Sequence, residues 1–362
     1  MKPLPKATLK PQDKLVDVIE ERSHFGIFLG EKCYWNPASL PNGHVAIIGT
    51  SGSGKTQTLK AIAYELPKLF PTIKIIIIDH HGDQQLPNEV CYPLDMESPY
   101  GINPLTIDLD TKGGGPSLQV IAVASILRKA LTMGANQEGL LIEILSHCYK
   151  QKGITQSDVS SWTNEAPTFQ DLRNEINSRI ENGCKESSKL ALKLAAMFEY
   201  GIFNKPQPNL KLPLIRFDLS ALAKVPGLSA IATESIIKQL MDSHRIMGEI
   251  EHKIPRSFIF IDEAKEVKNS KILNIILSDG RKYGLCCILA SQRDSELSKE
   301  VIANTSTKIV LAVDQTEVKL VSNKFRFSIS LVADLQPLEA LVRMGNEGIK
   351  TKILPYYLRI KS

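Results

Sequence analysis

The sequence predicts an α/β fold, a three-layer sandwich in which helices cover both faces of a mainly parallel β-sheet. Apolar, branched runs that suit strands buried on both sides occur at residues 45–48, 73–78, 258–261 and 285–290. Segments with apolar residues at helical spacing lie between these runs, and such alternation is typical of a parallel sheet. A glycine-rich loop joins the first run to a helix-forming segment, which is a third sign of this fold class.

The composition excludes several classes of protein. The chain has 362 residues, of which 43% are hydrophobic and 23% charged, so it is not of the disordered class. Its apolar runs stop far short of the roughly 20 residues that cross a bilayer, and residues 1–14 lack the apolar core of a secretion signal. We therefore expect a cytoplasmic protein without a membrane partner. The net charge of +5 permits an acidic partner such as nucleic acid without requiring one.

We divide the chain into four parts. They are a short strand-containing segment (residues 1–43), the first half of an ATPase-like core (44–110), a mainly helical insertion (111–210) and the second half of the core with a C-terminal edge hairpin (211–362). Expected helices cover 57–69, 118–133, 137–151, 169–182, 186–200 and 228–247. Further strands are expected at 14–19, 25–29, 214–219, 308–313, 339–344 and 351–356.

The glycine-rich loop has the spacing of a phosphate-binding loop. Gly49 is followed, after four residues, by Gly54, Lys55 and Thr56. Its backbone N–H groups can wrap a polyphosphate at a helix N-terminus, Lys55 can reach the β- and γ-phosphates, and Thr56 can bind Mg²⁺. The expected nucleotide-binding residues are Gly49, Thr50, Ser51, Gly52, Ser53, Gly54, Lys55, Thr56 and Gln57. A plain glycine turn before a helix is the alternative interpretation.

Two adjacent carboxylates, Asp262 and Glu263, follow the apolar run at 258–261. Ligands bind at the carboxyl ends of strands in open parallel sheets. Asp262 can hold the water shell of Mg²⁺, and Glu263 can polarise the water that attacks a phosphate, whereas capping of a helix is the alternative role for the pair. The glutamate favours a hydrolase, and the absence of an Asn-Lys-x-Asp signature favours ATP over GTP.

Polar residues also flank the run at 285–290. Gln292 follows it and can hydrogen-bond the γ-phosphate or the lytic water, or can be a solvated turn residue. Arg281 precedes it and can clamp a phosphoryl group, while the neighbouring Lys282 is equally well explained as a solvated loop residue. We predict catalytic roles for Lys55, Glu263, Gln292 and Arg281.

Taken together, these motifs resemble the HerA-like branch of the HerA/FtsK ATPases, a branch of the RecA-like (ASCE) P-loop NTPases. The resemblance rests on Gly49 to Thr56, Asp79-His80-His81-Gly82-Asp83, Asn103-Pro104-Leu105, Ile261-Asp262-Glu263, Gly280-Arg281-Lys282, Ala290-Ser291-Gln292-Arg293, Glu339-Ala340-Leu341-Val342 and Pro355-Tyr356-Tyr357. It covers most of the chain from His44 onward and is weakest in the helical insertion.

The resemblance implies a ring-forming, usually hexameric, ATP-driven DNA translocase that works with a separate nuclease or other effector, in DNA end processing or defence against phage. It also implies that Arg281 acts in a neighbouring subunit and that residues 79–83 line the nucleotide site or its subunit boundary, although His81 can instead cap a turn. Arg179, Lys185, Lys189 and Lys193 can form a basic face for DNA or a solvated helix surface.

One feature departs from the family pattern. Larger HerA proteins carry a β-barrel ahead of the phosphate loop, whereas here residues 1–43 stand before the core, so the chain looks most similar to compact HerA-like ATPases of prokaryotic defence islands. Two other functions stay open. One is a nucleotide-gated scaffold that activates a partner without moving along DNA, and the other is a peripheral ATPase of secretion or conjugation.

Overall fold

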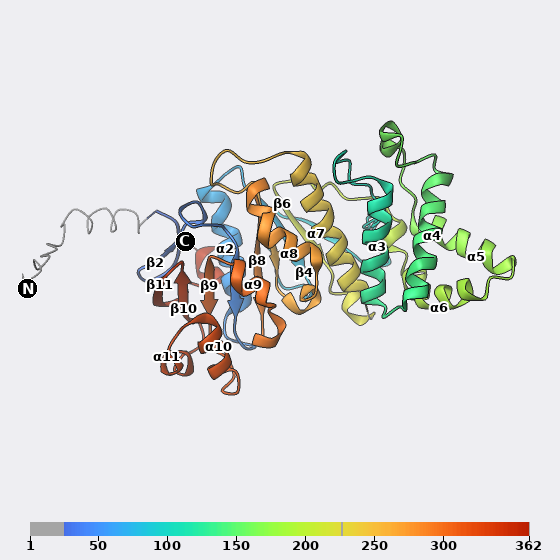
Figure 1. Ribbon diagram of the computed structural model, residues 1–362. Helices are drawn as coiled ribbons and strands as arrows, with labels where there is room; N and C mark the ends of the chain where they lie inside the picture. The colour runs from blue at the N-terminus through green and yellow to red at the C-terminus, as the bar shows by residue number, and fades with distance from the viewer. Residues whose placement is uncertain (1–24, 226, 362) are drawn as a thin grey trace, which may run out of the picture.

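The computed structural model describes residues 25–225 and 227–361 and contains one large sheet (Figure 1). The strand expected at 14–19 lies outside the described residues. The strands are β1 (Ile27–Gly30), β2 (Cys33–Trp35), β3 (Val45–Ile48), β4 (Lys74–Asp79), β5 (Val90–Pro93), β6 (Leu214–Asp218), β7 (Ser257–Ile261), β8 (Leu285–Ser291), β9 (Thr307–Val310), β10 (Glu339–Met344) and β11 (Glu347–Lys352).

In the described part of the chain, nine strands form this sheet in the order β11-β10-β9-β3-β8-β7-β4-β6-β5. The run from β9 to β5 is parallel throughout, and β10 and β11 close one edge as an antiparallel hairpin. Strands β1 and β2 pair separately. The prediction of a mainly parallel α/β sheet is therefore confirmed.

Helices cover both faces of the sheet. They are α2 (Lys55–Leu69), α3 (Pro116–Ala130), α4 (Ala135–Gln151), α5 (Phe169–Glu181), α6 (Lys185–Tyr200), α7 (Leu228–Ile246), α8 (Lys271–Asp279), α9 (Lys299–Asn304), α10 (Val318–Phe325), α11 (Ile329–Ala333) and α12 (Tyr356–Arg359). None of the helices in the described residues has the length and apolar character to cross a membrane.

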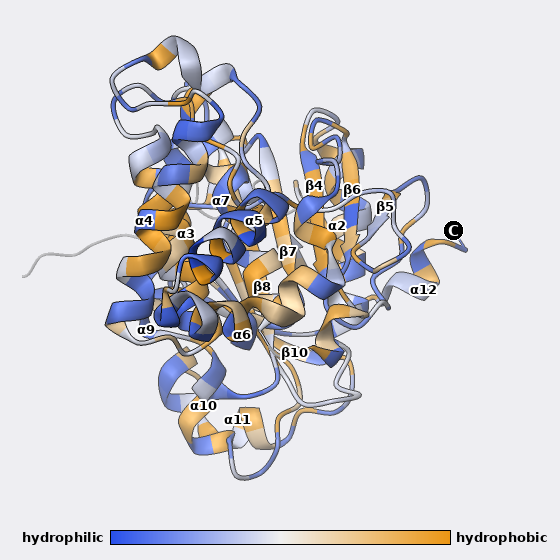
Figure 2. Cartoon of the chain, turned by 90° about the vertical axis from the view of Figure 1, so that its right-hand side faces the viewer, coloured by the Kyte–Doolittle hydropathy of each residue, from blue (hydrophilic) through white to orange (hydrophobic). Residues whose placement is uncertain are grey.

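Alternation along the strands divides the apolar side chains between two layers. In β3, Val45 and Ile47 join the layer that α2, β1 and α12 cover, whereas Ala46 and Ile48 join the layer under α7 and α8. Figure 2 shows the strands largely in the colour of hydrophobic residues, between helices of mixed character. Burial on both faces explains why the strand sequences read as continuous apolar runs.

The helices α3 to α6 extend the core and do not form a separate one. Trp162, Phe169 and Leu194 belong to the same buried cluster as Ile76 and Ile78 of the sheet. In Figure 1 these helices lie beyond α7, at the end of the molecule away from the β10–β11 hairpin. The boundaries that we predict for the insertion, 111 and 210, stay a prediction.

The segment Asn103-Pro104-Leu105 anchors these helices through its backbone. The carbonyl of Pro104 accepts from Gln119 Nε2 of α3 (2.6 Å), and the carbonyl of Leu105 accepts from Tyr149 Oη of α4 (2.5 Å). The side-chain amide of Asn103 donates to a third carbonyl, that of Pro167 (3.0 Å). Buried polar groups need such partners, so this motif serves the junction between sheet and helices.

Two strands of the large sheet differ from the prediction, and β2 was not expected from the sequence either. The second hairpin strand lies at Glu347–Lys352, four residues before the expected 351–356, because Gly345 (φ 60°) and Asn346 make a two-residue turn directly after β10. Tyr356 then starts helix α12. The edge strand β5 was not predicted from the sequence.

Two buried histidines join elements of this core. His44 is fully buried, and its Nδ1 accepts a hydrogen bond from the backbone N–H of Cys287 (3.0 Å). His244 of α7 donates from Nδ1 to the carbonyl of Leu240 (2.7 Å) and accepts at Nε2 from Ser257 Oγ (2.9 Å). Burial lowers the pKa of each ring to about 4.

We predict that the free energy of unfolding falls as the pH drops from about 6.5 towards 4. The unfolded chain protonates these histidines near pH 6.5 and the folded chain only near 4, so the unfolded state binds more protons in this window and gains stability. At pH 5 the loss is on the order of 2 kcal/mol for each histidine relative to pH 7.5. Urea unfolding followed by circular dichroism measures it.

The variant His44→Asn keeps an acceptor near the Nδ1 position but cannot titrate, so its unfolding free energy should depend less steeply on pH. His252→Asn changes an exposed histidine and is the matched control, with an unaltered dependence. An identical pH dependence in wild type and in both variants would contradict the prediction.

Candidate nucleotide-binding site

The phosphate-binding loop lies between β3 and α2 and is fixed by the neighbouring strands. The backbone N–H of Gly49 donates to the carbonyl of Ser291 (3.2 Å), and that of Thr50 donates to the carbonyl of Ala312 (2.8 Å). Gly54 precedes α2 with φ 107°, a conformation that glycine adopts without strain. These contacts hold the loop open towards the carboxyl ends of the parallel strands, where ligands bind in such sheets.

Lys55 folds back over the loop. Its Nζ donates to the carbonyls of Gly49 (2.7 Å) and Thr50 (2.9 Å). Burial lowers the pKa of the ammonium group, and nearby carboxylates oppose this shift. A cavity of about 430 Å³ opens beside it, with walls from Ser51, Gly52, Gly54, Lys55, Thr56, Gln57, Leu59, His81, Asp83, Asp262 and Gln292.

The order of the strands brings three distant segments to this cavity. Strand β8 lies between β3, which carries the loop, and β7, which ends at the acidic pair. Gln292 follows β8, so its exposed side chain lies between the loop and Asp262 and lines the cavity together with both. Eight of the predicted site residues line the cavity, namely Ser51, Gly52, Gly54, Lys55, Thr56, Gln57, Asp262 and Gln292. The other five do not line it, namely Gly49, Thr50, Ser53, Glu263 and Arg281.

Asp262 is oriented by a histidine. Its Oδ1 accepts from the backbone N–H of His80 (3.2 Å) and contacts His80 Nδ1 (3.0 Å), while His80 Nε2 contacts Thr233 Oγ1 of α7 (3.1 Å). The side chain of Asp262 is only 6% exposed. Its Oδ2 is buried and has no hydrogen-bond partner among the described residues. A buried carboxylate oxygen without a partner is costly, so it calls for a ligand.

The surroundings of that oxygen fit a divalent cation. Asp79, Asp83 and Asp262 each offer an oxygen, and these atoms lie within 4.8 Å of one another. Thr56 Oγ1 lies 3.4 Å from Asp83 Oδ2. Burial and the charges of Asp79 and Asp262 raise the pKa of Asp83, a repulsion that a bound cation relieves. Magnesium prefers such oxygen ligands. Asp83 was not among the predicted metal ligands, although it closes the Asp-His-His-Gly-Asp motif.

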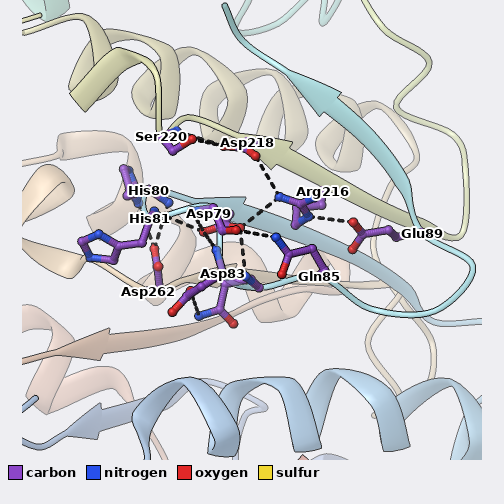
Figure 3. Close-up of polar contacts among 12 residues, drawn as sticks. Asp79, His80, His81, Asp83, Gln85, Glu89, Arg216, Asp218, Ser220 and Asp262 are labelled. Carbon is purple, nitrogen blue, oxygen red and sulfur yellow. Dashed lines mark hydrogen bonds and ion pairs between the residues drawn. The ribbon is translucent and has the colours of Figure 1, made fainter. Parts of the chain in front are cut away.

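Asp79 has a different task, which Figure 3 shows. Its Oδ1 accepts from the backbone N–H of Gly82 (2.7 Å), and its Oδ2 accepts from that of Gln84 (3.0 Å). Further N–H donors come from His81 (3.2 Å) and Asp83 (3.3 Å). A wholly buried carboxylate with four backbone donors fixes the turn after β4.

Arg216 of β6 neutralises this buried carboxylate. Its Nη1 lies 3.1 Å from Asp79 Oδ2 and 3.2 Å from Asp218 Oδ2, and its Nε lies 2.7 Å from Glu89 Oε1. Burial disfavours the charged guanidinium, but the hydrogen bond to Glu89 and the surrounding charges outweigh it and raise the pKa of Arg216. One guanidinium therefore contacts three carboxylates behind the cavity (Figure 3).

Glu263 is held away from the cavity. Its side chain is 3% exposed, its Oε2 contacts His81 Nε2 (2.8 Å), and its Oε1 lies 3.3 Å from Lys265 Nζ. Burial opposes protonation of His81, but the hydrogen bond to Glu263 outweighs it and raises the pKa of the ring. The Glu263 side chain makes no capping hydrogen bond to the short helix that follows, so helix capping is not its role.

Arg281 lies at the other end of β8. It precedes the strand, whereas the cavity lies after it, and a seven-residue strand spans roughly 23 Å. Arg281 borders a separate surface hollow with Glu249, His252 and Lys253. Its neighbour Lys282 pairs with Glu249 on the surface (2.8 Å), which agrees with a solvated loop residue. A single chain does not bring Arg281 to its own cavity.

The fold and the site define a P-loop ATPase-type domain of the RecA-like class. The family model described as the central domain of helicase HerA matches residues 32–335, and the chain belongs to this family. Over 346 residues it is 24% identical to the probable DNA double-strand break repair helicase HerA of Methanocaldococcus jannaschii. This match covers 79% of this chain and 65% of the relative. A shorter match to the HerA helicase of Pyrococcus furiosus is 30% identical over 91 residues and covers 22% of this chain and 16% of the relative. The chain thus spans less than two thirds of the length of these relatives.

Solved structures share the fold. VirB4 of Thermoanaerobacter pseudethanolicus superposes with a TM-score of 0.78 at 19% identity, covering 91% of this chain and 96% of that one. The bacterial conjugative coupling protein TrwB, in a form complexed with sulphate, gives a TM-score of 0.64 at 16% identity, covering 93% and 92%. At such identities the likeness shows the fold.

We predict that Arg216→Met destabilises the protein by roughly 3–5 kcal/mol, since removal of one partner of a buried ion cluster leaves the others uncompensated. Urea unfolding of wild type and variant measures the difference. Arg128→Met is the control, because Arg128 is 47% exposed where it pairs with Glu138, and exposed pairs contribute at most about 1 kcal/mol. Equal losses in the two variants would show that Arg216 does not hold the site together.

Proposed function

We propose that this chain is an ATP-hydrolysing motor that assembles into a homo-hexameric ring and moves DNA, together with a separate nuclease or other effector in DNA end processing or phage defence. The observation that carries the proposal is the meeting of the phosphate loop, Asp262 and Gln292 at one cavity, with β8 between the other two strands. Membership of the HerA family supports it, as do the names of the helicase relatives.

The residues of the cavity fit ATP with Mg²⁺. TrwB, which shares the fold, has been solved in complex with ADP and Mg²⁺. Here the loop N–H groups and Lys55 would bind the phosphates, and Thr56, Asp83 and Asp262 would hold the cation. Bound Mg²⁺ supplies charge neutralisation on the phosphate oxygens.

Glu263 and Gln292 act on the terminal phosphate. Glu263 polarises the attacking water as general base, for which its side chain turns from His81 towards the cavity. Gln292 donates from its amide to the γ-phosphate or orients the water. The contact with His81 keeps the base away from the cavity until the site is filled, which limits wasteful hydrolysis.

Arg281 completes the site from a neighbouring subunit. In its own chain it stands at the opposite end of β8 from the cavity, so only a second copy can present it to bound nucleotide. A guanidinium placed beside the γ-phosphate stabilises the charge that develops there. Hydrolysis then requires assembly, as a ring motor needs.

One prediction of this proposal concerns the rate of ATP hydrolysis. Lys55→Ala should abolish ATP hydrolysis, and Glu263→Gln should keep ATP binding but lower the rate at least 100-fold, because the general base is lost. Glu266→Gln, three residues further on and outside the cavity, is the control and should hydrolyse ATP like wild type. Duplex or single-stranded DNA should raise the wild-type rate several-fold, and this effect should weaken as salt increases.

Two outcomes would overturn parts of the proposal. If DNA neither raises the rate of hydrolysis nor binds at low salt, the proposal of a DNA motor is wrong. Full activation of the effector by the Glu263→Gln protein, at abolished turnover, would favour a nucleotide-gated scaffold over a motor.

Another prediction of this proposal concerns Arg281. Arg281→Ala should keep nucleotide binding and lose hydrolysis at least 100-fold, whereas Lys282→Ala, which removes a surface cation beside it, should change the rate less than twofold. In mixtures, Glu263→Gln subunits should supply Arg281 to the intact sites of Arg281→Ala subunits and restore part of the rate. No recovery at any mixing ratio would exclude the action in a neighbouring subunit.

A further inference from the structure

A second hollow is strongly basic. It has a volume of about 410 Å³ and lies among α9, α10 and the paired strands β9 and β10. Five of its lining residues are cations, namely Lys299, Lys308, Lys324, Arg326 and Arg343, and none of the lining residues that the structure describes is acidic. This basic hollow is distinct from the nucleotide cavity, because Lys308 lies near the start of β9, whereas the phosphate loop contacts Ala312, after the end of that strand.

Two of these cations lie opposite each other on neighbouring strands. Lys308 of β9 and Arg343 of β10 are directly opposite in the antiparallel register. Like charges at such positions destabilise a strand pair. Burial, together with the charges of Arg326 and Arg343, lowers the pKa of Lys308, which reflects the same repulsion. An anion between them would convert this repulsion into attraction.

The hollow is built by fixed contacts. Arg343 donates from Nε to the carbonyl of Phe325 (3.1 Å), from Nη1 to that of Asn346 (3.1 Å) and from Nη2 to that of Arg326. Arg326 follows α10 in the left-handed conformation (φ 59°), which is uncommon for a residue with a side chain. These contacts explain Arg343 as a cap of α10, but they give no use for the charges of Lys308 and Arg326.

Counter-charges are few around the basic hollow. Lys324 pairs with Asp294 (2.9 Å), but across residues 25–225 and 227–361 no carboxylate forms an ion pair with the other four cations. Within the described residues, Lys308 Nζ donates to one acceptor, the carbonyl of Thr305 (2.6 Å). The helical region is different, because there Arg179 pairs with Glu143 and Glu175 and Lys189 pairs with Glu186.

We propose that the basic hollow binds a phosphate group through Lys308, Arg326 and Lys299. Guanidinium and ammonium groups together suit phosphate oxygens, and the half-buried position of Lys308 strengthens its attraction for an anion. The phosphate can come from the backbone of DNA or from a free phosphate compound, and both offer the same oxygens. The site stands on its own cations and does not depend on ATP hydrolysis at the other end of the sheet.

The test compares the double variant Lys308→Gln/Arg326→Gln with the control Lys271→Gln/Lys319→Gln. Both lose two positive charges, but Lys271 and Lys319 are exposed and do not line the basic hollow. Both proteins carry Lys55→Ala as well, so that the nucleotide cavity does not bind the probes. The probes are a fluorescein-labelled 30-base-pair duplex, followed by anisotropy at several salt concentrations, and inorganic phosphate, followed by calorimetry.

If DNA is the source, the double variant should bind the duplex at least tenfold more weakly than the control, with a salt slope smaller by about one to two. If free phosphate is the source, only the affinity for inorganic phosphate should fall. Equal binding by both variants with both probes would overturn the site. If the two proteins differ in phosphate binding but bind the duplex equally, DNA is not the source of the phosphate, and the site itself is supported.

Thermal melting separates this result from misfolding. Without phosphate, the double variant should melt at or above the temperature of the control, since a repulsion has been removed. Added phosphate should raise the melting temperature of the control more than that of the double variant. An equal rise in both would contradict the site.

Discussion

The candidate site depends on a single buried guanidinium. Arg216 meets three carboxylates, and the one of Asp79 in turn receives four backbone N–H groups from the turn after β4. Such clusters contribute little net stability against an apolar replacement, but they are costly to break in half. Their value here is positional. The same turn carries His80, which orients Asp262, and His81, which holds Glu263. Everything that touches the acidic pair from this side is placed by the Asp79 turn.

The sheet supplies the second constraint. Neighbouring strands lie about 4.8 Å apart, so the interposed β8 keeps the loop strand and the acidic strand roughly 10 Å from each other. A terminal phosphate and a water molecule fit into a gap of this width, and the tip of β8 adds Gln292 to it. Adjacent strands would leave no such room. In the proposed function, this spacing lets the loop and the carboxylates act on opposite sides of one phosphate.

Local patterns predicted the parts of the fold that are locally determined. The loop, the apolar strands and the long helices such as α2 and α7 lie within a few residues of their expected bounds, because buried faces impose a period on the sequence. The edge strand β5 was missed, since it is four residues long, ends in Pro93 and is partly exposed. The second strand of the hairpin begins earlier than predicted, because the two-residue turn at Gly345 and Asn346 sets the register between β10 and β11.

The site was predictable as a set of motifs and not as a set of contacts. Asp262 and Gln292 follow apolar runs, so their position at the cavity could be read from the sequence. The partnership of Arg216 with Asp79 spans 137 positions, and that of His81 with Glu263 spans 182. No periodicity links residues so far apart. The role of Asp83 was missed for the same reason, because only the fold brings it beside Thr56 and Asp262.

Strand β8 carries Gln292 after one end and Arg281 before the other. A hydrogen-bonded strand in the middle of a sheet does not stretch, so it behaves as a rigid rod. In the proposed ring, one end of this rod senses the phosphate in its own subunit and the other reaches the nucleotide of the next. In such a ring, β8 itself would couple the nucleotide sites of two neighbouring subunits, because a displacement at one end of a rigid strand moves the other end as well.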